Sequence, residues 1–184
     1  MTENIKVRTR DVSEQVHQKL SDASGRGIVL FEGVKTDLNI ENTSECSDYI
    51  RDKIVLKLFK RNLLEDGDVC LKYLNKNSNI KKSVSELQTS FSAKKKTLVI
   101  CSYGVHIQKM LSILEIFKAS LTQEKDNKKE KASSCFQQHN KLTCFTLVTV
   151  GRNELLDKKT SVPILVTVIA SPENELNLEG FNRQ

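Results

Sequence analysis

The chain has 184 residues, a net charge of +6 and a pI near 9.0, a balance that favours a polyanionic partner and suits one core with extensions. Aromatic residues make up only 5% of the chain and tryptophan is absent, which argues against a stacking platform of the RRM type. Because no apolar run approaches the length of a membrane span, no transmembrane helix is predicted, and the first ten residues lack the apolar region of a signal peptide.

The first third of the chain is predicted to be an extension of the main domain. Residues 1–33 are polar at the start and are expected to form a mobile or partner-docked arm, whose last seven residues (GIVLFEG) can form a short strand. Residues 34–66 are predicted to carry an amphipathic helix over 44–64, which Thr43 or Ser44 can cap. The apolar side of this helix must pack on the domain or on a partner.

Two strand-to-helix units follow. The segment 68–74 (DVCLKYL) alternates as a strand does, and 98–101 is a short apolar run typical of a buried strand. A turn (NKNSN), in which Asn77 or Ser78 can cap a helix, separates the first strand from its helix, and Gly104 breaks the second strand. The two helices are indicated by apolar residues at helical spacing: Ile80, Val84, Leu87 and Phe91, then Ile107, Met110, Leu111, Leu114 and Phe117.

Both helices begin with basic side chains, where acidic ones are usual. Lys76 lies in the first turn, Lys81 and Lys82 open the first helix, and His106 and Lys109 open the second. Cations beside a positive helix end make sense if an external phosphate binds there. If the two strands are parallel, both junctions lie at one edge of the sheet, which predicts one anion-binding surface. The alternative is that these side chains only point into solvent.

The last third is predicted to contain a loop and two strands. A charged run makes residues 122–140 an expected disordered loop. Residues 142–150 and 162–170 alternate as strands whose two faces are both apolar, and Arg152 lies near the start of the connection between them. One face should carry the helices, and the other should meet the N-terminal extension or a second protein.

No catalytic or metal-binding constellation is recognised. The five cysteines fit a reducing compartment, and Cys135, His139 and Cys144 lack a fourth ligand and a usual zinc spacing. Nothing places a serine or cysteine beside a base and an orienting carboxylate. We therefore expect no enzyme activity, no metal and no cofactor, and we assign His106 to phosphate or RNA contact.

Four motifs stand out along the predicted order β-α-β-α-β-β: NIKKSV (79–84), SYGVHIQKMLSILEIFK (102–118), GRNEL (151–155) and VPILVT (162–167). With these motifs the chain resembles the Alba fold, and within it the Alba-like subunits of yeast nuclear RNase P and RNase MRP, of which this would be the smaller member of a heterodimer. That resemblance implies an α+β fold: a four-stranded mixed sheet with two helices on one face, plus the N-terminal helical extension. It places an Alba-like RNA-binding domain at residues 67–184.

The resemblance also implies a function. Such a protein is a non-catalytic, nuclear and nucleolar subunit that pairs with a second Alba-like subunit, joins other RNase P/MRP proteins and binds a stem with an internal loop, away from membranes. The RNA cleaves pre-tRNA or pre-rRNA, and in budding yeasts the pair is also found on telomerase RNA. The implied RNA contacts are Lys76, Lys81, Lys82, Tyr103, Gly104, His106, Lys109 and Arg152.

Departures from archaeal Alba keep a second function open. Its Lys-Lys pair after the first strand is Lys76-Asn77 here, and its Arg-rich second loop is replaced by Ser102-Tyr103. The alternative is a chromatin protein that binds duplex DNA. Two roles are likewise open for Tyr103, which either stacks on an unpaired base or packs internally.

Overall fold

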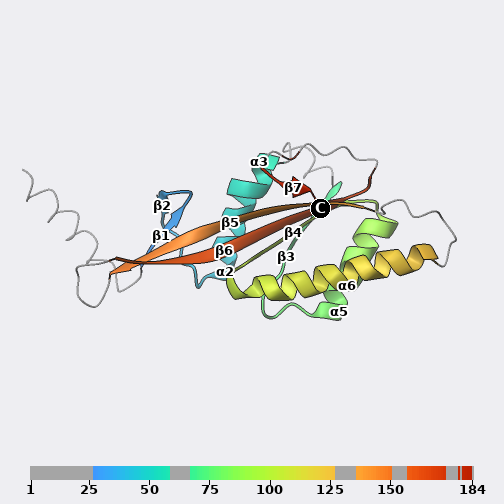
Figure 1. Cartoon of the computed structure of the whole chain (residues 1–184), viewed down its shortest axis with the longest axis horizontal. Coiled ribbons are helices and arrows are strands. Elements are labelled where there is room, and N and C mark those ends of the chain that lie inside the picture. Colours follow the sequence, from blue (N-terminus) through green and yellow to red (C-terminus); the bar gives the residue numbers. More distant parts are fainter. Residues whose placement is uncertain are drawn as a thin grey trace, which may run out of the picture.

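The structure of the chain is a computed structural model that describes residues 27–58, 67–126, 136–150, 157–172, 178 and 180–183. The predicted arm up to residue 26 and the predicted contact Arg152 lie outside the described residues. Figure 1 shows a sheet seen almost edge-on, with helices on both of its sides. Among the described residues, none of the helices has the length and apolar character needed to cross a bilayer.

One mixed sheet organises the fold. Its strands are β1 (Ile28–Phe31), β2 (Val34–Thr36), β3 (Val69–Tyr73), β4 (Thr97–Tyr103), β5 (Gln137–Val150), β6 (Asp157–Ala170) and β7 (Asn182–Arg183). They are ordered β2-β1-β5-β6-β4-β3, with β7 also paired to β5. Strands β3 and β4 are parallel, so the two strand-to-helix junctions do share one edge of the sheet. The predicted four-stranded mixed sheet is present as β3 to β6, and β1, β2 and β7 enlarge it.

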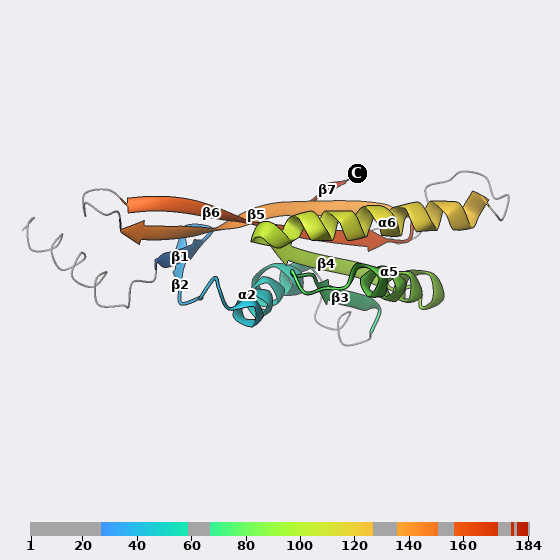
Figure 2. The same ribbon diagram turned by 90° about the horizontal axis from the view of Figure 1, so that it is seen from below.

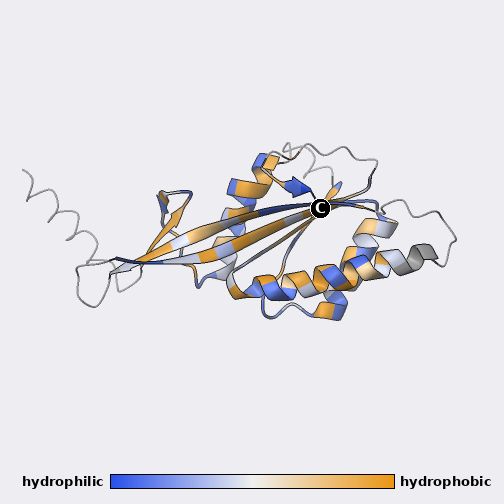
Figure 3. Cartoon of the chain, in the orientation of Figure 1, coloured by the Kyte–Doolittle hydropathy of each residue, from blue (hydrophilic) through white to orange (hydrophobic). Residues whose placement is uncertain are grey.

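Two helices cover one face of the sheet, as predicted. Helix α5 (Ile80–Gln88) continues into the π-helical segment η2 (Thr89–Ala93), and α6 (Ile107–Asp126) follows the single turn η3 (Gly104–His106). Figure 3 shows hydrophobic and hydrophilic residues alternating along α6, as one buried helix face requires. The residues buried in this layer include Val84, Leu87, Leu98, Ile100, Met110, Ile113, Leu114 and Phe117. Leu111, expected on the buried face, is 45% exposed.

The other face is covered by the N-terminal helix of the same chain. Its segments α2 (Thr43–Ile50), η1 (Arg51–Val55) and α3 (Leu56–Leu58) follow one another without a break. Asn42, rather than Thr43 or Ser44, caps it: the Asn42 side chain accepts hydrogen bonds from the Ser44 and Glu45 amides and donates one to the Glu45 carboxylate at 2.7 Å. The core beneath contains Ile50, Val55, Val99, Cys101, Phe145, Val166 and Val168. The second face of the sheet was expected to meet either the N-terminal extension or a second protein, and the structure shows that the extension covers it.

The expected boundary between arm and extension at residues 33 and 34 falls within a hairpin. Strands β1 and β2 form a hairpin whose two turn residues, Glu32 and Gly33, have φ of 52° and 80°, as a tight turn between twisted strands requires. Strand β1 also pairs with β5 from Ile28 opposite Val148 to Phe31 opposite Phe145. Figure 2 shows β5 and β6 projecting beyond β3 and β4, with β1 and β2 beside them. Residues 28–36 are thus part of the sheet.

The expected disordered loop over 122–140 was too long at both ends. Helix α6 continues to Asp126 and β5 begins at Gln137, while residues 127–135 lie outside the described part of the chain. The polar run QQHNK hides the start of β5 from a hydrophobicity pattern. It is nevertheless a strand because it pairs in register with β6, from Gln137 opposite Ala170 to Lys141 opposite Val166.

A buried histidine on β5 predicts a pH dependence of stability. Burial, and to a smaller extent the charge of Arg183 on β7, lower the pKa of His139 below its ordinary value of 6.5. The unfolded chain then takes up this proton at a higher pH than the folded chain. We therefore expect the free energy of unfolding to fall as the pH drops below about 6.5. Urea unfolding at pH 7.5, 6.5 and 5.5 measures the effect. If a His139→Gln variant shows the same pH dependence of the free energy of unfolding as the natural chain, His139 is not its cause.

Candidate nucleic-acid interface

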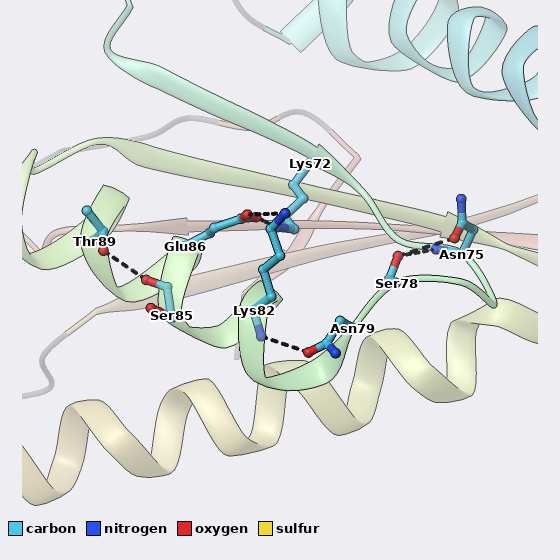
Figure 4. A network of polar contacts seen from close by, with 8 residues as sticks. All are labelled: Lys72, Asn75, Ser78, Asn79, Lys82, Ser85, Glu86 and Thr89. Atoms are coloured by element: carbon cyan, nitrogen blue, oxygen red, sulfur yellow. Dashed lines mark hydrogen bonds and ion pairs between the residues drawn. The ribbon is translucent and has the colours of Figure 1, made fainter.

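The first junction is a turn held by side-chain hydrogen bonds (Figure 4). The Asn75 side chain accepts from the Asn77 amide at 3.0 Å, and the Ser78 hydroxyl accepts from the Asn75 amide at 3.0 Å. Helix α5 then begins at Ile80, with Asn79 as its cap in place of the expected Asn77 or Ser78, because the Asn79 side chain accepts from the Lys82 amide at 3.0 Å. These bonds fix the backbone from which Lys76 and Lys82 project.

The second junction lies against the first. The buried hydroxyl of Ser102 donates to the Leu74 carbonyl at 2.8 Å, and the Leu74 amide donates to the Cys101 carbonyl at 2.9 Å. Across the surface, the Lys109 ammonium donates to the Lys76 carbonyl at 2.6 Å. Two segments about 30 residues apart in sequence are thereby joined at one edge of the sheet.

The basic side chains of this edge are only partly balanced. Glu86 on α5 forms a short ion pair with Lys72, and its carboxylate lies 4.0 Å from the Lys82 ammonium. The contact with Lys72 lowers the pKa of Glu86 most, and the charge of Lys82 lowers it further. The Lys82 side chain is 78% exposed, so a pair at this distance is weak and leaves the ammonium open to another anion. Lys76 and Lys81 are also exposed.

Tyr103 packs internally, so of its two predicted roles the stacking one is not compatible with the structure. It is 7% exposed, its hydroxyl donates to the Ile40 carbonyl at 3.2 Å, and its ring lies 6.2 Å from the Phe145 ring. Burial raises the pKa of Tyr103, which keeps the phenol neutral. His106 lies beside it, with 6.0 Å between ring centres.

The structure therefore gathers most of the predicted contact residues at one place. Lys76, Gly104, His106 and Lys109 meet where β3 and β4 end, and Lys81 and Lys82 lie on the first turn of α5. A groove of about 620 Å³ opens beside them, and sequence reasoning missed its walls. Those walls come from Ile40, Glu41 and Thr43 before and in α2 and from Ser161, Val162 and Pro163 of β6. No local pattern links segments that far apart.

The structure shows where two of the three side chains considered as metal ligands lie. His139 and Cys144 lie on β5 five positions apart, and an odd spacing along a strand directs side chains to opposite faces of the sheet. The third member of the trio, Cys135, lies outside the described residues. Within the ranges that the structure covers, no three His, Cys, Asp or Glu side chains gather closely enough to hold a metal ion.

Comparison with known proteins agrees with this architecture. Residues 73–129, from the end of β3 past the end of α6, match the Alba family, so the chain contains an Alba domain. The chain is also 38% identical over 165 residues to the ribonucleases P/MRP protein subunit POP6 of Saccharomyces cerevisiae, covering 85% of this chain and 98% of that protein. The chain belongs to the family of Alba-like ribonuclease P/MRP subunits.

Proposed function

We propose that this chain is a non-catalytic RNA-binding subunit of the RNase P and RNase MRP ribonucleoproteins. The observation that carries the proposal is the pair of joined junctions, where Lys76, Lys109 and His106 share one edge with Lys81 and Lys82 nearby. Oriented helix ends and lysines bind phosphates without reading sequence. The similarity to a yeast ribonuclease P/MRP subunit supports RNA as the polyanion.

The same proposal specifies the setting. The chain binds a stem with an internal loop in the catalytic RNA, which itself cleaves pre-tRNA at the 5′ side or processes pre-rRNA. It works in the nucleus and the nucleolus, and telomerase RNA is a further target. Arg152, on the connection between β5 and β6, is proposed to extend the contact.

A competition experiment separates this function from binding of duplex DNA. Full-length protein bound to a labelled RNA stem with an internal loop is challenged with unlabelled stem or with DNA duplex of equal length, at one salt concentration because affinity depends on salt. Displacement by RNA at a far lower concentration than by DNA supports the proposal. Equal displacement by both would support the chromatin alternative.

We propose a second Alba-like subunit as a partner that covers the outer side of α6. Leu142 is 71% exposed and pairs across β5 and β6 with Leu165, so both lie on the face that carries α6. Leu111 and Ile116 are exposed on α6 itself. The second face of the sheet is already covered by the chain's own helix, so the need for a partner rests on this patch, meaning the exposed apolar side chains Leu111, Ile116 and Leu142 taken together.

Polar substitution of this patch is expected to release the partner. Because Leu111 and Leu142 are exposed, Leu111→Gln with Leu142→Thr should leave the fold intact while removing apolar contact area. Size-exclusion chromatography with light scattering should show a 1:1 complex for the natural chain and a monomer for the variant. The exposed Val34 on the distant hairpin is the matched control, as Val34→Thr. A natural chain that stays monomeric beside its partner would contradict the proposal.

The chain is expected to contribute no acid, base or metal to RNA cleavage. His106 is the histidine at the basic edge, and its ring packs beside Tyr103 with no carboxylate paired to it among the described residues. Purified protein with its partner but without RNA should not cleave pre-tRNA. Reproducible cleavage that disappears in His106→Ala would overturn this assignment.

A further inference from the structure

The groove beside the basic edge differs from that edge in its chemistry. Its lining includes the apolar side chains of Tyr103, Val162 and Pro163, and that of Val105, which is 83% exposed. The hydroxyl of Tyr103 is hydrogen-bonded to the Ile40 carbonyl. Lysines alone need no apolar surface to bind phosphates, so the groove suits an occupant with an apolar part.

A protein strand is a poor occupant of this groove. Strand β4 ends at Tyr103, opposite Ile164, so the residues Ser161 to Pro163 of β6 have no neighbour on that side among the described strands. An added strand could pair only along this short edge. Pro163 lies within it, and a proline on an edge disfavours pairing because it offers no amide donor.

The charges around the groove give an occupant its orientation. Lys76 lines the groove, and Lys109 is bonded to the Lys76 carbonyl just outside it. Glu41, from the segment before α2, also lines the groove. A carboxylate repels phosphate and accepts hydrogen bonds from amino groups, whereas the lysines attract phosphate. Phosphates are therefore directed to Lys76 and Lys109, and amino groups toward Glu41.

We propose that the groove receives one unpaired nucleobase with an exocyclic amino group, namely adenine, cytosine or guanine, while its flanking phosphates bind Lys76 and Lys109. The base buries its faces against Val162, Pro163 and the edge of Tyr103, and its amino group donates to Glu41. This inference rests on the proposed RNA-binding function and deepens it. It makes the N-terminal segment, through Glu41, part of the RNA site.

The test compares three RNA stems of equal length: one fully paired, one with a single bulged adenosine and one with a single bulged uridine. Affinities are measured with the full-length protein. Burial of one base against apolar side chains predicts that the bulged-adenosine stem binds roughly 5- to 150-fold more tightly than the paired stem. The bulged-uridine stem should gain less, because the N3–H donor of uracil lies between two carbonyl oxygens that the Glu41 carboxylate repels, whereas adenine offers an amino group.

Three variants locate the effect. Ser161→Ile fills the groove from an exposed strand position and adds no charge. The affinity for the bulged-adenosine stem should therefore fall to that for the paired stem. The affinity for the paired stem should not change. Glu41→Ala should abolish the preference for adenosine over uridine. Val105→Ala, at a highly exposed position, should cause a smaller loss of the bulge preference even if Ser161→Ile fails to fold.

The outcomes separate this inference from the proposed function. Equal binding of all three stems by the natural chain would overturn the base site and leave RNA binding intact. Retention of the full bulge preference in folded Ser161→Ile, or in Val105→Ala, would also overturn it. The same holds if Ser161→Ile keeps its RNA affinity and instead loses a protein that co-purifies with the natural chain, because the groove would then bind that protein. If no stem binds at all, the proposed function fails and this inference fails with it.

Discussion

Replacing Phe145 by alanine is expected to cost about 3–5 kcal/mol in the free energy of unfolding. The side chain is fully buried between the sheet and the N-terminal helix, with its ring 5.8 Å from Phe31 and 6.0 Å from Tyr49. Its removal leaves a cavity at the point where the hairpin, β5 and α2 meet. A loss of this size is a large share of the stability of an ordinary domain.

The measurement is chemical unfolding of the full-length chain, with Leu142→Ala as the matched control on the same strand. Leu142 is exposed, so its truncation should change the free energy of unfolding by about 0.5 kcal/mol or less. Limited proteolysis should also cut within residues 43–58 of Phe145→Ala faster than in the natural chain. If Phe145→Ala costs no more than Leu142→Ala, the N-terminal helix is not packed on the sheet as described.

The second large effect is expected on RNA binding. Replacing Lys81 and Lys82 together by alanine should weaken binding of the RNA stem and flatten the slope of log affinity against log salt by about one to two units, because each phosphate contact contributes about 0.7 to 0.9. Stability should change little. Lys82 is highly exposed and its contact with Glu86 is 4.0 Å long, and Glu86 keeps its ion pair with Lys72.

A matched pair of lysines at the opposite edge of the sheet provides the control. Lys94 and Lys95 are exposed and lie before β4, from which only Lys96 separates them, whereas Lys81 and Lys82 follow β3 at the other edge. Lys95 has φ of 51°, which asparagine tolerates better than alanine, so the control is Lys94→Ala with Lys95→Asn. Both doubles remove two charges. If the control loses as much affinity as the Lys81/Lys82 double, binding reflects net charge rather than the proposed edge.

The order of the elements was predictable because side-chain periodicity carries it. Val84 and Leu87 on α5, and Met110 and Leu114 on α6, recur at helical spacing and are buried in the structure. Leu111 has the same apolar character and is exposed, because the helix periodicity alone gives a stripe wider than the surface that the sheet covers.

The features that could not be predicted from the sequence depend on contacts between residues distant in the sequence or on side-chain geometry. The hairpin β1–β2 is too short to be distinguished from an extended arm until its pairing with β5 is known. The caps Asn42 and Asn79 stand one or more positions from the expected residues, and boundaries of this kind shift easily. The sequence leaves two roles open for Tyr103, because its burial depends on contacts with Ile40 and Phe145, which lie far away in the sequence.

The most direct measurement of the proposed function is sequencing of the RNA that the full-length chain carries in cells. Tagged natural chain and the Lys81→Ala/Lys82→Ala variant are expressed at equal levels, crosslinked to their nucleic acid and purified. We expect the RNAs of RNase P and RNase MRP to dominate the natural sample, with crosslinks at a stem beside an internal loop, and to be depleted in the variant. Recovery of genomic DNA in their place, or of the same RNAs in equal amount with both proteins, would contradict the assignment.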